Sequence, residues 1–243
     1  MLLYCNVGFY LSIACIVLGL IFLAIYIVEK CRGYSAKMVV LKSRVSLCFI
    51  ACGMCGLLFK GVGLFSVLMI MGLVFGFAGD IWLDLKLIAG ENERRYTYQG
   101  FRSFMAGHVC FIIAIMSTFG GFEKPMFPIC AIILGIVIGL LIIVIGEKTG
   151  LDFGEYKLIS SVYSCLVFFM AFLAGAYTLQ NGFSSISSLL IFIAGILFAI
   201  SDIVLSQMYF GKNNDTKARI AMNNILYYAA QFVMAMSVVL FVC

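Results

Sequence analysis

Charged residues are scarce in this chain. Asp, Glu, Lys and Arg make up 11% of its 243 residues, whereas 64% are hydrophobic and the mean hydropathy is +1.15. A soluble domain of this size cannot bury so much apolar surface, so we expect lipid to be its solvent. Only two prolines occur, and the apolar stretches are far longer than the roughly ten-residue alternating segments of a membrane β-barrel. The composition therefore predicts an all-α membrane protein.

The chain also lacks the short motifs of several common enzyme classes. It contains no G-x-S-x-G nucleophile elbow, no P-loop and no dinucleotide-binding fingerprint. Its single histidine, His108, has no Ser or Cys partner in a recognisable motif, which argues against an acyl-transfer triad. No patch of basic and aromatic residues indicates nucleic-acid binding. The sequence therefore favours neither nucleotide chemistry nor a serine or cysteine hydrolase.

The cysteines are numerous but do not indicate a metal site. Most of the ten lie inside apolar segments, and "CFIACGMC" (48–55) has the spacing C-x3-C-x2-C. Structural zinc and iron–sulfur sites need four ligands and a shaped second shell, and the chain offers one histidine. We interpret the thiols as small packing residues, and we expect no metal and no cofactor.

Apolar stretches of about twenty residues, the length that crosses a bilayer, occur eight times. They lie near 7–28, 38–59, 64–85, 103–119, 128–146, 158–177, 186–209 and 220–241. The first has no basic region before it and no small-residue cleavage site after it, so we expect a retained helix. No connection is long enough for a soluble domain. Residues 1–243 are predicted to form a single integral membrane domain, a polytopic bundle of eight transmembrane helices.

The basic residues predict the orientation in the cell membrane. All but two of the 16 Lys and Arg residues follow the first, third, fifth or seventh segment, and the exceptions are Lys60 and Lys124. By the positive-inside rule these four connections are cytoplasmic, so both termini are expected outside. The net charge of +5 is thus a topology signal and also favours anionic headgroups. One or two cytoplasmic basic residues, with Lys37 as the candidate, could contact a phosphate.

Two aspartates interrupt the apolar segments. Asp80 lies in "FAGDIWLDL" (77–85) and Asp202 in "FAISDIVLS" (198–206). An ionised carboxylate in hydrocarbon is costly, so such residues indicate a functional site. Both fit the pattern [Gly/Ser]-Asp-Ile-x-Leu, four segments apart, and this suggests a parallel four-plus-four internal repeat of a kind known in transporters. The alternative is a buried structural pair that ties two helices together.

Other polar side chains lie at a similar depth. Asp80 precedes Lys86 by six residues and His108 follows Arg102 by six, which places both about 9 Å inside the cytoplasmic boundary at 1.5 Å per residue. The other polar residues of this half are Tyr163, Asn224, Tyr228 and Gln231, of which the last three share one helix face. We therefore expect a partly wet cavity that opens toward the cytoplasmic leaflet.

Each of these residues also has a purely structural interpretation. His108 could hydrogen-bond between helices, and Tyr163 and Tyr228 could be packing or interface aromatics. Asp84, one turn beyond Asp80, is expected to be a solvated charge at the end of its helix.

Two buried carboxyl groups in one pocket would hold one proton between them near neutral pH, which provides one acid and one base. Such a pair serves acid-catalysed hydrolysis through an oxocarbenium-like state. One group donates a proton, and the other stabilises positive charge or activates water. The sequence does not decide which of Asp80 and Asp202 is the acid.

Four stretches resemble one family. "GDIWL" (79–83), "FMAGHVCFI" (104–112), "LFAISDIVL" (197–205) and "YYAAQ" (227–231) occur in the order found in the lysoplasmalogenase-like (YhhN-type) membrane proteins. The resemblance implies an eight-helix bundle that hydrolyses the vinyl ether bond of lysoplasmalogens, releasing a fatty aldehyde and glycerophosphoethanolamine or glycerophosphocholine. It also implies that Asp80 and Asp202 match the essential aspartates of the family, and that His108, Tyr228 and Gln231 match its polar motif positions.

The chemistry implied by the resemblance needs a protonated carboxyl, an anionic carboxylate and water. Tyr228, Gln231 and His108 would position the water or the glycerol, and cytoplasmic Lys or Arg would hold the phosphate of a lysophospholipid substrate. A proton- or cation-coupled transporter that uses the same two aspartates is the alternative function. The sequence leaves the oligomeric state open.

Overall fold

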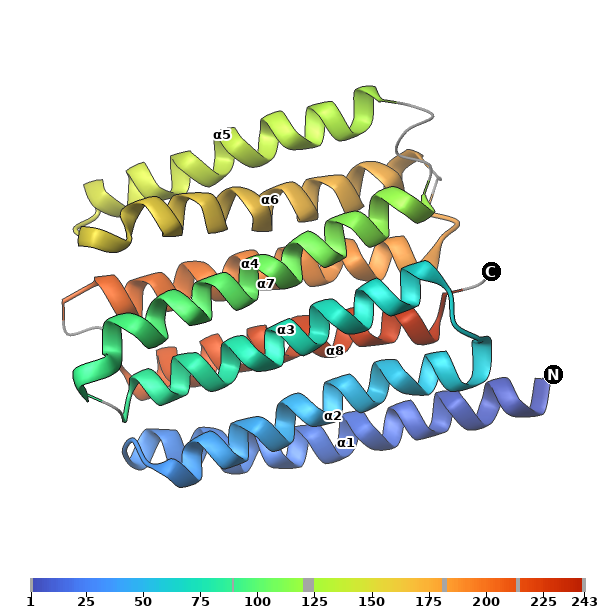
Figure 1. Cartoon of the computed structure of the whole chain (residues 1–243), viewed down its shortest axis with the longest axis horizontal. Coiled ribbons are helices and arrows are strands. Elements are labelled where there is room, and N and C mark those ends of the chain that lie inside the picture. The colour runs from blue at the N-terminus through green and yellow to red at the C-terminus, as the bar shows by residue number, and fades with distance from the viewer. Residues whose placement is uncertain (1, 89, 120–124, 181–182, 213–214, 242–243) are drawn as a thin grey trace.

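The computed structural model describes residues 2–88, 90–119, 125–180, 183–212 and 215–241. These residues are all-helical, so the predicted fold class is confirmed (Figure 1). The long helices are α1 (Leu2–Arg32), α2 (Ala36–Lys60), α3 (Leu64–Lys86), α4 (Glu93–Thr118), α5 (Met126–Lys148), α6 (Lys157–Gln180), α7 (Ile186–Phe210) and α8 (Lys217–Val239). Two short 3-10 helices, η1 (Gly90–Asn92) and η2 (Gly154–Tyr156), precede α4 and α6.

The helices begin and end where the local sequence dictates. Ser35, Ser185 and Thr216 cap α2, α7 and α8, and each side-chain oxygen accepts a hydrogen bond from the backbone N–H three residues later. Gly61 ends α2 with a φ of 88°, a value that L side chains rarely adopt. The largest boundary difference is at α4, which begins at Glu93 and not near residue 103.

The polar start of α4 is helical because it packs on α3. The ring of Tyr96 stacks on Trp82 with centroids 5.5 Å apart, and a Cβ on Gly100 would lie 2.5 Å from a methyl carbon of Leu83. Hydropathy alone reports only the apolar part of such a helix, which is why the expected segment was shorter.

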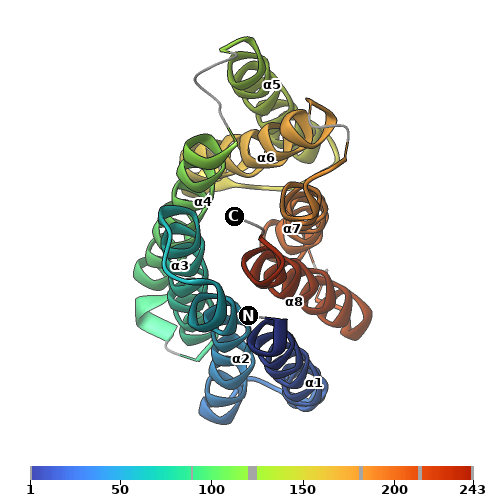
Figure 2. The same cartoon turned by 90° about the vertical axis from the view of Figure 1, so that its right-hand side faces the viewer.

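The helices form two rows when the bundle is seen from one end (Figure 2). One row contains α2, α3 and α4, and the other contains α1, α8 and α7. Helix α6 packs against both α4 and α7 and closes the bundle on one side, with α5 outside it. The space between the rows is where polar groups from distant parts of the sequence come together.

The packing has the same pattern in the two halves of the chain. Helix α2 packs on α8, and α6 packs on α4, which are equivalent pairs if residues of α1–α4 correspond to those of α5–α8. Asp80 and Asp202 then occupy the third helix of each half. The four-plus-four repeat stays a prediction that this packing favours.

Helices α5 and α6 approach closely because α5 carries two small residues one turn apart. A Cβ on Gly135 would lie 2.7 Å from Cα of Phe169, and a Cβ on Gly139 would lie 2.7 Å from Cα of Cys165. Small residues at this four-residue spacing let membrane helices pack backbone to backbone. The close pairing fixes α6, which carries part of the site described below.

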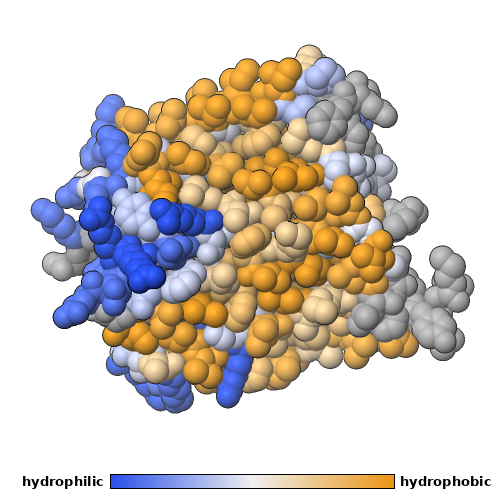
Figure 3. Space-filling view, viewed as in Figure 1, coloured by the Kyte–Doolittle hydropathy of each residue, from blue (hydrophilic) through white to orange (hydrophobic). Residues whose placement is uncertain are grey.

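The chain is an integral membrane protein. Among the described residues, seven helices are long and apolar enough to cross a membrane, and apolar residues cover most of the face shown in Figure 3. The exception is α8, which corresponds to the expected segment 220–241. It packs against α1, α2, α3 and α7 and carries buried polar residues such as Asn223 and Gln231. A helix enclosed by other helices does not need an apolar surface.

The two ends of the bundle differ in polarity. The connections after α1, α3, α5 and α7 lie at the hydrophilic end (Figure 3), and α1 begins and α8 ends at the opposite end (Figure 1). Lys124, one of the two basic residues expected at that opposite end, lies outside the described residues, and the side chain of Lys60 is also outside them. That the hydrophilic end is cytoplasmic stays a prediction.

Candidate active site

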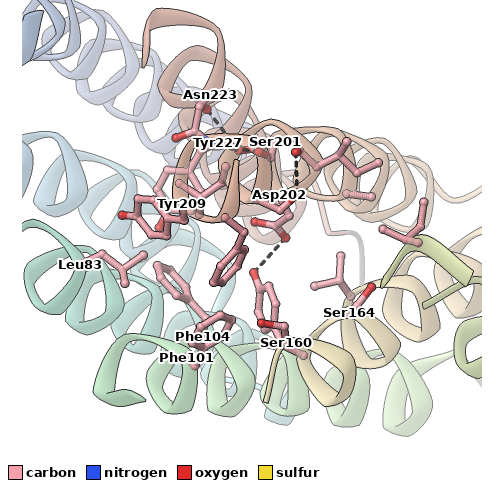
Figure 4. A pocket seen from close by; sticks show the side chains of 18 of the residues that line it. Leu83, Phe101, Phe104, Ser160, Ser164, Ser201, Asp202, Tyr209, Asn223 and Tyr227 are labelled. Carbon is pink, nitrogen blue, oxygen red and sulfur yellow. Dashed lines mark hydrogen bonds between the residues drawn. The ribbon is translucent and has the colours of Figure 1, made fainter. Parts of the chain in front are cut away.

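One cavity receives side chains from all eight helices (Figure 4). It contains about 1080 Å³ of empty space, part of it open to the outside. Its residues come from the last half of α3 and α7 and from the first half of α4, α6 and α8, so it lies toward the hydrophilic end. Asp80 of α3 and Asp202 of α7 both line it.

The cavity is apolar at one end and charged at the other. Its lining includes apolar side chains of α5 and α6 and charged side chains of α1, α2 and α3, and these two groups of helices lie on opposite sides of the bundle (Figure 2). The apolar lining includes Ile142, Ile143, Val167 and Phe168, and the charged lining consists of Lys30, Lys42 and Asp80. Such a shape fits a molecule that has an apolar chain and a polar head.

Asp202 lies in the less polar part. It is half-buried and points from α7 toward the side where Ser160 of α6 lies (Figure 4). The hydroxyl of Tyr163 donates a hydrogen bond to its Oδ2 at 2.9 Å. The Tyr163 ring is held edge-on by Phe101 and His108, each with its centroid 5.6 Å away. Within the described residues, no Lys or Arg forms an ion pair with Asp202.

Asp80 is surrounded by hydrogen-bond donors. Its side chain is 1% exposed. The Ser46 hydroxyl of α2 donates to Oδ2 at 2.6 Å, and Nζ of Lys42 lies 3.4 Å from Oδ1. Tyr227, on α8, is a further neighbour of this carboxyl group. A carboxylate with these partners is satisfied as an anion.

Asp84 is not the solvated helix-end charge that the sequence suggested. Its side chain is 0% exposed, and it lies at the centre of an ion cluster. It accepts hydrogen bonds from Lys30 at 3.1 Å, from Lys42 at 3.2 Å and from the Tyr26 hydroxyl at 2.9 Å. The expectation was wrong because α1 and α2 cover the end of α3 and exclude solvent there.

The two aspartates of the cavity have separate partners. A shared proton would require their carboxyl groups to hydrogen-bond one another, but Asp80 bonds Ser46 and Lys42 whereas Asp202 bonds Tyr163. The expected pair, which would share one proton, is therefore replaced by two carboxyl groups with unlike surroundings. One belongs to an ion-paired cluster formed by Lys30, Lys42, Asp80 and Asp84, called the ion cluster below, and the other faces apolar surface.

Three of the predicted substrate-binding residues lie behind the cavity wall. His108, Tyr228 and Gln231 are 3%, 0% and 1% exposed, and none of them is among the lining residues. His108 supports Tyr163, as described. The hydroxyl of Tyr228 lies 3.3 Å from the Ser46 hydroxyl, and Nε2 of Gln231 donates to the Tyr227 hydroxyl at 2.7 Å. Their place is therefore to hold the groups that touch the two aspartates.

Two other predicted residues do line the cavity, namely Tyr163 and Asn224. The side-chain nitrogen of Asn224 donates to the carbonyl of Ile220 at 2.7 Å. Its neighbour Asn223 bonds both the carbonyl and the hydroxyl of Ser201 at 3.0 Å (Figure 4). These amides and hydroxyls supply uncharged polar surface.

Lys37 does not reach the cavity. Its side chain is 66% exposed and pairs with Glu29 at 3.0 Å. At 100° per residue, a lysine five positions further along the helix points about 140° away, and this position is Lys42, which is buried. The phosphate contact expected of Lys37 is therefore misplaced.

The sequence did not single out Lys30, Lys42 or Tyr227 as site residues. Basic residues near the ends of apolar segments were attributed to topology, and the direction of a side chain around a helix depends on its neighbours. Two signals were available. Lys42 lies well inside its helix, and Asp84 shares a helix face with Asp80 because it follows by four residues.

The cysteines of the "CFIACGMC" stretch pack inside the bundle. Cys48, Cys52 and Cys55 are free and buried, and Sγ of Cys52 lies 3.8 Å from Sδ of Met236. Among the described residues, no three His, Cys, Asp or Glu side chains are grouped as metal ligands would be.

Comparison with known proteins gives one result. A family model described as the YhhN family matches residues 37–238. The matched region includes Asp80, Asp84, Asp202 and Lys42, whereas Lys30 lies before it. No curated protein and no solved structure matches the chain.

Proposed function

The chain belongs to the YhhN family, and from this membership and the form of the cavity we propose that it hydrolyses the vinyl ether bond of lysoplasmalogens. The products are a fatty aldehyde and glycerophosphoethanolamine or glycerophosphocholine. One observation carries the proposal. An aspartate without a cationic partner, Asp202, and an ion-paired aspartate, Asp80, line the same amphipathic cavity.

Asp202 is the proposed acid. A charged carboxylate without a counter-ion is costly beside apolar surface, so Asp202 is the carboxyl group that would carry a proton. It transfers this proton to the β-carbon of the vinyl ether. A C–H bond forms there, the double bond is lost, and the α-carbon becomes an oxocarbenium ion. Tyr163 holds the carboxyl group in place through its hydroxyl.

Asp80 is the proposed electrostatic partner. The Ser46 hydroxyl and Lys42 favour its charged form, and a fixed anion stabilises the developing oxocarbenium ion. Water adds to the α-carbon and returns a proton to the emptied carboxylate of Asp202. The hemiacetal then breaks its bond to the glycerol oxygen, which takes the proton that Asp202 has regained. The hemiacetal hydroxyl gives its own proton to Asp202 as it becomes the carbonyl of the departing aldehyde.

The polarity of the cavity orients the substrate. The alkenyl chain would lie between α5, α6 and α7, and the glycerol backbone would lie near Asn223, Asn224 and Ser201. Lys30 stands at the charged end and would attract the phosphate. If the hydrophilic end is cytoplasmic, the scissile bond lies in the cytoplasmic leaflet with both termini outside.

The test is aldehyde release by the purified full chain. Alkenyl lysophosphoethanolamine should yield aldehyde, and the matched acyl lipid should yield no fatty acid. Asp202→Asn and Asp80→Asn should each lower the rate by at least about a hundredfold. Ser164→Ala, a change of another cavity hydroxyl on α6, serves as the control and should retain most of the rate. Fatty acid release, or aldehyde release that survives both aspartate changes, would refute the proposal.

A coupled transporter is the competing interpretation of the same aspartates. A transporter needs a path that continues to the end of the bundle opposite the hydrophilic end, whereas the cavity lies toward the hydrophilic end. Movement of intact lipid or of a small molecule in proteoliposomes, without any aldehyde, would favour it.

A further inference from the structure

A second, smaller cavity adjoins the large one at the hydrophilic end. It contains about 570 Å³ of empty space, part of it open. Lys30, Tyr209 and Asn223 line both cavities, so the two spaces meet at these three side chains. Figure 4 shows Tyr209 and Asn223 at the edge of the large cavity.

The smaller cavity carries charges of both signs. Besides Lys30 and Tyr209, it is lined by Lys86, Glu93, Tyr34 and Asp215. Two ammonium groups, two carboxylates and two phenol rings therefore surround one space. Neither an anion nor a cation alone matches such a lining, but a zwitterion with a separated phosphate and amine does.

Contacts hold these groups in position around the space. Nζ of Lys86 lies 3.6 Å from Oε1 of Glu93 and 3.8 Å from the centroid of the Tyr209 ring. Tyr34 lies beside Asp215, and partial burial together with this carboxylate raises the pKa of Tyr34. The Glu93 side chain is 61% exposed, which leaves it accessible to a ligand.

We propose that the smaller cavity, called the headgroup cavity below, binds the zwitterionic headgroup of a lysophospholipid. The phosphate lies at Lys30 and Lys86, and the amine lies at Glu93 and Asp215 with the rings of Tyr34 and Tyr209 beside it. The choice of a lysophospholipid rests on the proposed function. Only the glycerol carbons separate the ether oxygen from the phosphate, so a lipid with its ether bond at Asp202 brings its headgroup to the junction of the two cavities.

This arrangement makes Glu93 and Asp215 specificity-determining residues. Their negative charges favour a headgroup that ends in an ammonium group and disfavour one that ends in a bare phosphate. We therefore expect the full chain to bind an ethanolamine lipid about tenfold more tightly than a lysophosphatidate with the same chain, since one charge-assisted contact supplies such a ratio.

The test measures binding of two non-cleavable lipids by calorimetry. Alkyl-ether lysophosphoethanolamine and alkyl-ether lysophosphatidate differ in the ethanolamine group, which the second lipid lacks so that it ends in a bare phosphate, and neither has a vinyl ether to hydrolyse. The double change Glu93→Gln with Asp215→Asn should abolish the tenfold preference. Asp215→Lys, at an exposed position, should reverse it. Glu155→Gln is the matched control, because Glu155 pairs with Arg94 at 2.7 Å at the same end of the bundle and does not line the headgroup cavity.

The outcomes separate this inference from the proposed function. The headgroup cavity is overturned if the preference for the ethanolamine lipid survives in the Glu93→Gln with Asp215→Asn variant and in the Asp215→Lys variant. It is also overturned if Glu155→Gln changes the preference as much as they do. Both conclusions hold even if the alkenyl lipid is hydrolysed. Failure of both lipids to bind also overturns it. A preference that the two changes remove supports the headgroup cavity, even if no aldehyde is ever released.

Discussion

Replacing Asp84 with Asn tests whether the ion cluster is a stabilising unit. In the folded protein, Asp84 is 0% exposed and bonds Lys30 and Lys42, whose side chains are each 8% exposed. The cluster of two lysines and two aspartates is neutral as a whole. The Asp84→Asn change would leave a net charge of +1 among buried side chains.

The expected cost follows from which lysine loses its partner. Lys42 keeps Asp80 at 3.4 Å, whereas Lys30 loses the one carboxylate with which it pairs among the described residues. Removing one partner of a buried ion pair costs about 3 kcal/mol at the lower end of the usual range, and the lower end applies because Asn still accepts a hydrogen bond. For a chain of this size such a loss lowers Tm by about 6–12 °C.

Thermal unfolding in detergent, followed with a thiol-reactive dye, measures this effect well because Cys48, Cys52 and Cys55 are buried in the fold. The double change Asp84→Asn with Lys30→Met is the informative control, since it removes both members of the pair and restores neutrality. We expect it to recover most of the lost Tm. Two results would show that the cluster is not an ion-paired unit. One is a Tm that Asp84→Asn leaves unchanged. The other is additivity, in which the double variant loses as much Tm as the two single variants lose together.

Three further changes probe the site and its support. Tyr163→Phe removes one hydrogen bond to the proposed acid, and kcat for aldehyde release should fall about tenfold while the chain stays folded; an unchanged kcat would remove Tyr163 from the mechanism. Lys37→Ala should change neither kcat nor Tm measurably, because exposed ion pairs contribute about 0–1 kcal/mol; a large loss would place Lys37 in the site after all. Gly139→Leu should separate α5 from α6 at Cys165 and lower the free energy of unfolding by about 3 kcal/mol, whereas Leu140→Ala, at an exposed position, should cost little. Equal effects of these last two changes would contradict the close packing.

The sequence predicted the helices because lipid imposes a simple constraint. A segment that crosses hydrocarbon must be helical and apolar over about twenty residues, and such segments are visible without knowledge of their neighbours. The alternation of basic connections likewise predicted which helix ends lie together. The prediction was weakest where a helix is not lipid-facing, as in the polar start of α4 and in α8.

The site was predicted in part. Asp80, Asp202 and Tyr163 stood out because polar groups inside apolar segments are rare, and all three line the cavity. The role of Lys42 was missed, because basic residues near the ends of apolar segments were attributed to topology. Only the packing of α1 and α2 over the end of α3 turns Lys42 inward and leaves Lys37 in solvent.

The aspartates show a second limit of sequence reasoning. Asp80 and Asp202 occupy matching motifs, so the sequence did not decide which of them is the acid and which the base. Their surroundings differ because α2 places Ser46 and Lys42 beside one, whereas α6 places Tyr163 beside the other. A motif shows where an aspartate occurs, but the charge state of that aspartate depends on side chains from other helices.

Hydrolysis in D₂O tests the proposed protonation of the β-carbon most directly. The aldehyde is trapped at once as a hydrazone, and its mass is measured by mass spectrometry. It should carry one deuterium at the carbon next to the carbonyl. In a parallel reaction in H₂¹⁸O the glycerol product should gain no ¹⁸O, because its own C–O bond is not cleaved. An aldehyde without deuterium at that carbon, or ¹⁸O in the glycerol product, would contradict the proposed mechanism.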